Sequence, residues 1–292
     1  MIEQHRTIHP KVPVGSMCAA LGVSRSWYYE RPRTARQSED EVLLRDAIER
    51  YLLAVPLSGY RPVTRHLRQC GLCVNHKRVL RIMRQESLLC QLKKQFVVTT
   101  DSDHGHPIYP NRIKGWSPVR CDQVWVADIT YIRLPMGFCY LAVILDAFSR
   151  RCLGWCLSDE ITTDLTLTAL NRAIVRRSPP KGLIHHSDRG VQYACTRYTK
   201  RLEEIGAVVS MSRVGNPYDN AKAESFFKTL KRQEVYINDY HDLREAEANI
   251  HHFIETVYNA KRLHSSLGYL SPIRFEEEQN AKIASVHNKV FI

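Results

Sequence analysis

Three acidic residues have types and spacing that suit metal-dependent chemistry at a phosphate. Asp128 lies inside the apolar stretch 125–131, where a charge is costly unless it is paired or bound to a metal ion. Asp188 directly follows another apolar stretch, and Glu224 begins a run of helical periodicity. Carboxylate oxygens suit divalent cations, and a pair of such ions can drive an in-line displacement at phosphorus. We therefore expect Asp128 to bridge two cations and the other two acids to hold one each.

Each acid also has an ordinary structural interpretation. An aspartate in a strand often caps a turn or pairs with an arginine, and an Asp-Arg-Gly segment is often only a loop. A glutamate four residues before a lysine, as Glu224 stands before Lys228, is usually an exposed helix pair. Taken singly, none of the three acids is therefore sufficient to predict a metal site.

The chain after residue 120 has the order of an α/β fold. Apolar, strand-forming stretches at 124–133, 138–145 and 151–157 predict an antiparallel meander. Two short strands then alternate with helices, and the expected segments are strands 183–186 and 207–211 and helices 162–177, 195–205, 242–258 and one capped by Asn220. This order predicts a ribonuclease-H-like five-stranded mixed sheet with flanking helices, in which strand ends bring the acids together.

Positive charge is concentrated in the front of the chain. Residues 1–120 contain 20 Lys and Arg against 10 Asp and Glu, whereas residues 121–292 contain 22 against 20. A net charge of +12 and a pI of about 9.3 suggest a polyanionic partner. A basic surface that only aids solubility fits the same numbers.

Residues 62–69 and 75–85 predict two helices joined by a turn at Gly71, an all-α helix–turn–helix. The second helix carries four basic residues, three of them at helical spacing on one face. A helical hairpin with a solvated charged face explains the pattern too, but we favour DNA contact. The candidate DNA-binding residues in this helix are Lys77, Arg78, Arg81 and Arg84.

The chain divides into four predicted parts. Residues 1–95 form a basic helical DNA-binding region, 96–120 a linker rich in proline and glycine, 121–280 the α/β core, and 281–292 a tail. Within the first part, residues 17–28 predict a short helix, a glycine turn and a second helix capped by Ser24, and residues 39–53 predict a further helix. The acidic run 276–278 is expected to be a solvated face.

The residues around the three acids resemble those of a known family. Between Asp188 and Glu224 lie 35 residues, as in the D,D(35)E pattern of retroviral integrases and their bacterial relatives. Over residues 40–275 the chain looks like the second-reading-frame product, OrfB, of transposases of insertion-sequence family three. The matching motifs are Trp-x-x-Asp-Ile-Thr-Tyr131, Leu-Asp-x-Phe-Ser-Arg150, His-Ser-Asp-Arg-Gly-x-Gln-Tyr193, Asp-Asn-Ala-x-Ala-Glu-Ser-Phe-Phe-x-Thr-Leu-Lys231 and Tyr-Asn-x-x-Arg-x-His-Ser-Ser-Leu-Gly268.

This resemblance implies a transposase that cleaves DNA at insertion-sequence ends and joins the 3′-hydroxyl to another strand. Asp128, Asp188 and Glu224 would be its catalytic residues and would hold two Mg²⁺ or Mn²⁺ ions per site. Lys231, with Lys228 nearby, would contact DNA phosphates. The implied partners are DNA (terminal repeats and target), a second copy of the chain in a homo-oligomer, and a first-frame, OrfA-type protein or fusion.

Two other functions fit parts of the pattern. A ribonuclease-H-like nuclease for RNA–DNA hybrids fits the strand order, but the 35-residue gap favours DNA strand transfer. A non-catalytic DNA-binding regulator, or a decayed transposase relic, would need only the basic half, and the intact acidic triad argues against it. No apolar stretch approaches the roughly 18 residues of a membrane span. We expect a cytoplasmic, nucleoid-associated protein without membrane contact.

Several other residues have two interpretations each. Asp146 is either a fourth metal ligand or, as we favour, a turn cap or arginine partner. His185 and His186 either orient a phosphate or lie buried at the strand end. Cys70 and Cys73 have metal-ligand spacing but lack a clear second pair, so zinc binding is the less favoured alternative.

Two segments near the end of the core have a less specific pattern. The loop 213–219 before the Glu224 helix is either a mobile DNA contact or a turn. For Arg262 and His264 we favour packing or DNA-backbone contact over a catalytic role.

Overall fold

The computed structural model describes residues 12–89, 107–213 and 220–290, with the backbone alone at 27–39 and 286–290. Residues 214–219 of the loop that is expected to be either a mobile DNA contact or a turn lie outside the described residues. Within these described ranges, no helix is long and apolar enough to cross a membrane.

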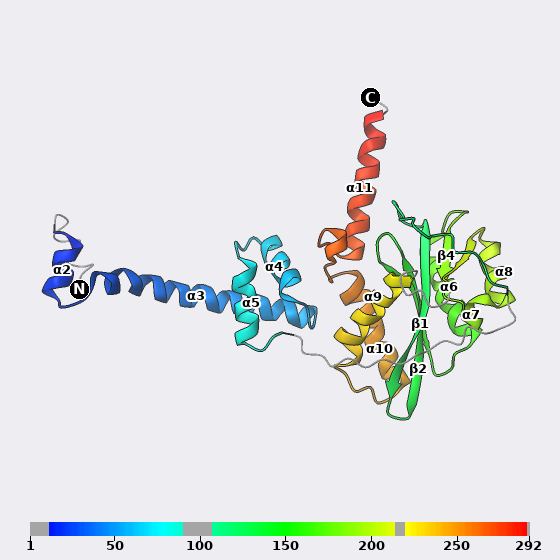
Figure 1. Cartoon of the computed structure of the whole chain (residues 1–292), viewed down its shortest axis with the longest axis horizontal. Helices are drawn as coiled ribbons and strands as arrows, with labels where there is room; N and C mark the ends of the chain where they lie inside the picture. Colours follow the sequence, from blue (N-terminus) through cyan, green and yellow to red (C-terminus); the bar gives the residue numbers. More distant parts are fainter. Residues whose placement is uncertain (1–11, 90–106, 214–219, 291–292) are drawn as a thin grey trace.

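A five-stranded mixed sheet forms the centre of the core (Figure 1). β1 (Val124–Leu134), β2 (Gly137–Asp146) and β3 (Cys152–Ser158) form an antiparallel meander, while β4 (Ile184–Ser187) and β5 (Val208–Met211) add in parallel on the far side of β1. The strand order β3-β2-β1-β4-β5 confirms the expected ribonuclease-H-like α/β fold.

Helices cover both faces of this sheet, and each face has its own hydrophobic cluster. Side chains alternate along β1, so Val124 and Val126 enter one cluster while Trp125 and Ala127 enter the other. The first face is covered by α9 (Ala221–Leu230), α10 (Leu243–His252) and η3 (Phe253–Asn259), and the second by α6 (Thr163–Arg177), α7 (Val191–Ala194) and α8 (Thr196–Glu204). The short segments η2 (Lys231–Val235) and η4 (Ser265–Leu267) follow α9 and η3.

The N-terminal region is helical, as expected, and consists of α2 (Val14–Ala20), α3 (Arg25–Ala54), α4 (Tyr60–Gln69) and α5 (His76–Gln85). The turn between α4 and α5 uses Gly71 at a φ of 87°, a conformation that favours glycine. Asn75 caps α5, because its side chain accepts a hydrogen bond from the Lys77 backbone N–H at 2.9 Å.

One expectation for this region is wrong. The helix after Ser24 and the helix at 39–53 are a single helix of 30 residues, α3, which extends far beyond α4 and α5 (Figure 1). Residues 31–40 lack an apolar stripe, which is why the sequence suggested a break. Six of these ten residues are arginine, alanine, glutamine or glutamate, which have high helix propensity.

The helical region packs against the core. Ile48, Tyr51 and Val63 belong to the same buried cluster as Val124 of β1. Gln233 donates a hydrogen bond from Nε2 to the Pro56 carbonyl at 2.7 Å. The segment 107–120, expected as a linker, also lies on the core, and its Arg112 N–H donates to Ser210 Oγ at 2.9 Å.

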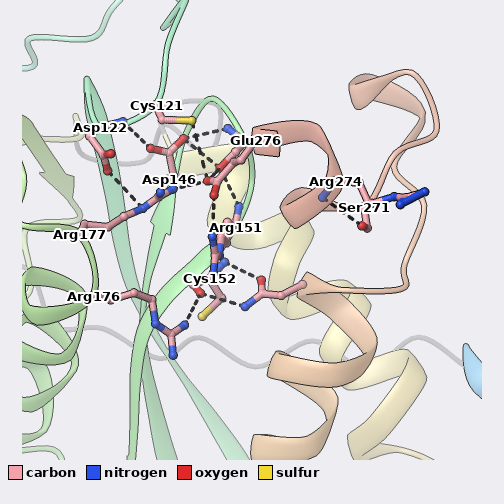
Figure 2. A network of polar contacts seen from close by, with 12 residues as sticks. Cys121, Asp122, Asp146, Arg151, Cys152, Arg176, Arg177, Ser271, Arg274 and Glu276 are labelled. Atoms are coloured by element: carbon pink, nitrogen blue, oxygen red, sulfur yellow. Dashed lines mark hydrogen bonds and ion pairs between the residues drawn. The ribbon is translucent and has the colours of Figure 1, made fainter. Parts of the chain in front are cut away.

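A buried ionic network holds the last helix, α11 (Pro272–Val290), to the core (Figure 2). Glu276 is only 4% exposed, and Arg151 donates to it at 2.7 Å. Arg177 forms a second ion pair with Glu276, and Ser149 Oγ donates to it at 2.6 Å.

The expected solvated face at 276–278 is therefore wrong for Glu276. Successive helical residues point in different directions, so one acid faces the core while Glu277 and Glu278 are exposed.

Candidate active site

The parallel pairing of β1 and β4 brings Asp128 and Asp188 to the same level of the sheet. Val126 is aligned with His186, so the residues two positions further along each chain stand side by side. The carboxylates are also oriented locally. Asp188 Oδ1 accepts a hydrogen bond from the Gly190 N–H at 2.9 Å, and Asp128 Oδ1 accepts one from the next backbone N–H at 2.9 Å.

Glu224 approaches the same place from α9. Ala223, Phe227 and Leu230 are buried and seat the helix on the sheet, which leaves Glu224 on an exposed part of its surface. Asn220 fixes the start of the helix by donating from Nδ2 to the Ala127 carbonyl at 3.3 Å.

The expected helix-capping role of Asn220 is wrong. It precedes α9 but makes no side-chain cap hydrogen bond, because its amide instead binds the strand beside Asp128. Sequence reasoning missed this contact, since an asparagine before a helix ordinarily indicates a cap.

Electrostatics show that the three carboxylates are close enough to influence one another. The pKa of Asp128 is raised well above its ordinary value by burial first, and then by the negative charges of Asp188 and Glu224. Lys231 opposes this shift with its positive charge. Burial also raises the pKa of Glu224. Among the described residues, neither Asp128 nor Glu224 has an ion pair within 4.0 Å.

The carboxylates of Asp128, Asp188 and Glu224 suit a divalent cation in both their oxygen chemistry and their negative charge. A cation would compensate the negative charges of Asp188 and Glu224 that raise the pKa of Asp128, and oxygen ligands suit hard divalent ions. The three carboxylates do not all reach one common point in the structure. Within the described ranges, no three His, Cys, Asp or Glu residues lie close enough together to hold one metal ion. Cys70 and Cys73 are exposed thiols, and Cys70 Sγ lies 3.6 Å from His66 Nε2.

A lysine lies at the other end of α9 from Asn220. Lys231 Nζ is 4.3 Å from the centroid of the Tyr131 ring, three residues beyond Asp128 on β1. Burial lowers the pKa of Lys231, and the charge of Asp128 opposes that shift. Lys228 is exposed one turn earlier. The sequence did not predict the contact between Lys231 and Tyr131, because the tyrosine was noted only as part of a sequence motif.

Three neighbouring polar residues have structural partners. Asp146 accepts hydrogen bonds from the backbone N–H groups of three residues at 2.7–2.8 Å, which confirms it as a turn cap. His185 and His186 are buried and contact Tyr198 OH at 3.0 Å and Ser210 Oγ at 2.9 Å. Burial lowers the pKa of His185 to about 3, so this ring stays neutral at ordinary pH.

Arg262 and His264, near the end of the core, are packed inside it, which is one of the two roles that we favoured for them. Arg262 donates from Nε to Gln233 Oε1 at 2.8 Å. His264 is 8% exposed, and burial lowers its pKa to about 2.

The basic residues of the helix–turn–helix lie on α5, apart from the acids (Figure 1). Lys77, Arg81 and Arg84 are exposed, and Arg78 is half-buried. Arg81 pairs with Glu41 at 2.9 Å, which reduces the charge that it can offer a ligand. Val79 and Met83 are fully buried, as expected.

Asp128→Asn is expected to stabilise the metal-free fold at neutral pH. A raised pKa means that the folded state disfavours ionised Asp128, so wild-type stability falls as the pH rises above the ordinary aspartate value of about 4. Denaturant unfolding should therefore show a gain for Asp128→Asn at pH 7 that disappears below about pH 4. The exposed Asp239→Asn is the control and should change nothing. A loss of stability at pH 7 would contradict the described electrostatics.

Family models match most of the described chain. An integrase core domain matches residues 118–217, a second integrase core domain model matches 206–272, and an HTH-like domain matches 37–96. The fold and these matches define an integrase-core protein, a class whose members are polynucleotidyl transferases.

Curated relatives are similar over nearly the whole chain. A 31 kDa protein of insertion element IS600 from Shigella sonnei is 37% identical over 92% of this chain and 100% of the relative. Transposase InsF of insertion sequence IS3A from Escherichia coli K12 is 34% identical over 96% and 98%. The chain belongs to the IS3 family of insertion-sequence transposases, which confirms the resemblance and assigns it to DNA transposition.

Solved structures with a similar fold include two retroviral integrase cores. The HTLV-2 integrase catalytic core in complex with magnesium is 15% identical, with a TM-score of 0.42 over 54% of this chain and 98% of that one. The BIV integrase core is 18% identical, with a TM-score of 0.43 over 56% and 99%.

Proposed function

We propose that the chain cleaves DNA at the ends of its insertion sequence and transfers the strand to target DNA by direct attack on phosphorus. The observation that supports this proposal is the integrase core in which β1 pairs with β4 and the negative charges of Asp188 and Glu224 act on the buried carboxyl of Asp128. Lys231 adds a cation at the edge of this acidic cluster.

Each side chain has a role in this proposal. Asp128 would be a ligand of two metal ions, and Asp188 and Glu224 would each be a ligand of one. When bound, a pair of Mg²⁺ or Mn²⁺ ions supplies the charge that activates the attacking water or 3′-hydroxyl and stabilises the leaving oxygen. Lys231 contacts a phosphate of the DNA end, and its stacking on Tyr131 limits the directions in which its ammonium points. Lys228 contacts the same strand one helical turn away.

DNA binding is proposed to depend also on α5. Replacing Lys77 and Arg84 together with glutamine should weaken DNA binding and flatten its dependence on salt. Two lost phosphate contacts correspond to a change of about 1.8 in the slope of log K against log salt. Arg81 is left in place because Glu41 already pairs with it.

Fluorescence anisotropy of labelled duplex DNA across a range of salt concentrations measures this slope. Lys181→Gln with Lys200→Gln is the matched control, since both lysines are exposed on the core. A slope unchanged by the α5 substitutions would mean that this helix does not face DNA.

The reaction requires two element ends, so we propose that the chain works as a homo-oligomer on DNA. A first-frame, OrfA-type protein or fusion is the proposed source of specific recognition of the terminal repeats. Adding that protein should restore joining if the purified chain alone is inactive on its own element end.

The experiment that tests the function compares substrates. Purified chain with Mg²⁺ is given a labelled DNA end of its element, alone and together with the first-frame protein, or an RNA–DNA hybrid. Joining of the DNA end to a second duplex supports the proposal. Hybrid cleavage without joining would favour a ribonuclease. DNA binding without either reaction, even with the first-frame protein present, would favour a regulator or relic.

A further inference from the structure

A pocket lies beside the acids, at the start of α9. Its volume is about 470 Å³, within the range of about 300–1,000 Å³ typical of small-ligand sites. Val124 and Val126 of β1 and Ala147 line it, and Ala221 and Lys222 line it from α9. Val126 is two residues before Asp128 on the same face of β1, about 7 Å along the strand, so the pocket adjoins the acidic cluster on that side.

The pocket lining is cationic. It contains Lys114, Lys222 and Arg213, and no carboxylate belongs to the lining among the described residues. Lys222 is half-buried in the first turn of α9. A lining with several positive groups suits an anionic ligand.

The pocket also has an aromatic wall. Trp116 lines it and is 43% exposed, which is unusual for so large an apolar side chain. The valines and Ala147 provide an apolar floor. An exposed aromatic face beside cations is the combination with which proteins bind single-stranded nucleic acid, the base stacking on the ring and the phosphate on the cations.

The direction of α9 relates this pocket to the acids. Lys222 begins the helix beside Val126, Glu224 follows near Asp128, and Lys231 after its end contacts Tyr131. A strand whose phosphate lies at the acids therefore has Lys231 on one side and the pocket on the other. A base that is still paired in a duplex cannot enter a recess of this size.

We propose that this pocket holds one unpaired nucleotide of the strand that is cut and joined, with its base against Trp116 and its phosphate on Lys222. This inference rests on the proposed function, because it takes the strand at the acids to be DNA.

The test measures binding in EDTA, so that no cleavage occurs. The full chain is titrated with a duplex that carries a short 3′ single-stranded extension, with 2-aminopurine as its first unpaired base, and with a blunt duplex of the same sequence. Wild type should quench the 2-aminopurine and prefer the extended duplex. Trp116→Ala should abolish the quenching and weaken binding of the extended duplex by about tenfold, the scale of one lost base–aromatic stack.

Matched variants separate the pocket from general effects. Trp116→Phe should retain most of the quenching, and Val119→Ala, an exposed change outside the pocket, should behave as wild type. Lys222→Gln should weaken binding of the extended duplex more than Lys200→Gln does. Unchanged quenching in Trp116→Ala, or an equal loss of affinity for blunt and extended duplexes, would overturn the pocket assignment.

The two proposals fail in different ways. Normal strand transfer with no effect of Trp116→Ala on binding would leave the proposed function in place and remove the pocket. If nucleotide binding depends on Trp116 but the chain never joins DNA, the pocket assignment stands and the proposed function is removed.

Discussion

Asp128→Asn should reduce strand transfer by about a thousandfold or more while leaving DNA affinity unchanged or slightly higher. Asp128 is the acid on which the charges of Asp188, Glu224 and Lys231 all act. Loss of a metal ligand here removes several kcal/mol of transition-state stabilisation, and about 4 kcal/mol corresponds to a factor of roughly a thousand. Affinity should not fall, because the substitution removes a charge that repels phosphate.

The measurement is single-turnover joining of a labelled DNA end, with affinity followed separately by anisotropy. Asp239→Asn, which removes an exposed charge from the same core, is the matched control and should join DNA at the wild-type rate. Joining by Asp128→Asn at a rate near wild type would remove Asp128 from the reaction. A parallel loss of affinity would indicate that the residue supports binding instead.

Glu276→Gln should lower the free energy of unfolding by about 3 kcal/mol. Removing one partner of a buried ion pair leaves the other charge without compensation, which typically costs 3–5 kcal/mol. Arg151 and Arg177 both pair with Glu276, whose side chain is 5% exposed. The lower end of the range applies, because Asp122 remains 3.5 Å from Arg177 (Figure 2).

Denaturant unfolding of the two proteins at pH 7 gives this difference. Glu277→Gln is the matched control, since the neighbouring glutamate is exposed on the same helix and should change stability by less than about 0.5 kcal/mol. Equal stability of Glu276→Gln and Glu277→Gln would show that α11 is not held by the ionic network.

The sequence predicts the sheet and the positions of the acids well, because both follow from local patterns. Apolar, strand-forming stretches predict β1 and its neighbours, and the alignment of Val126 with His186 then brings Asp128 and Asp188 to the same level of the sheet. In α9 the buried residues Ala223, Phe227 and Leu230 follow helical spacing, which is a local pattern as well.

What the sequence could not predict depends on contacts between distant parts of the chain. The burial of Glu276 is determined by arginines more than 95 residues earlier, and no local pattern encodes them. The hydrogen bond from Asn220 to Ala127 spans 93 residues. The pocket at Trp116 forms because the predicted linker lies on the core, which an irregular, proline-rich segment does not reveal. The continuity of α3 was missed because its middle lacks apolar residues.

The most direct test of the central claim is the number of Mn²⁺ ions bound by the chain in complex with a DNA end, measured by electron paramagnetic resonance of free Mn²⁺. Ions bound by the DNA itself cancel when wild type is compared with variants on the same DNA. We expect Asp128→Asn to lose a pair of ions per site and Glu224→Gln to lose one, because Asp128 would be a ligand of both ions. Identical Mn²⁺ binding by wild type and Asp128→Asn would contradict the assignment of these acids as the metal site for DNA cleavage and joining.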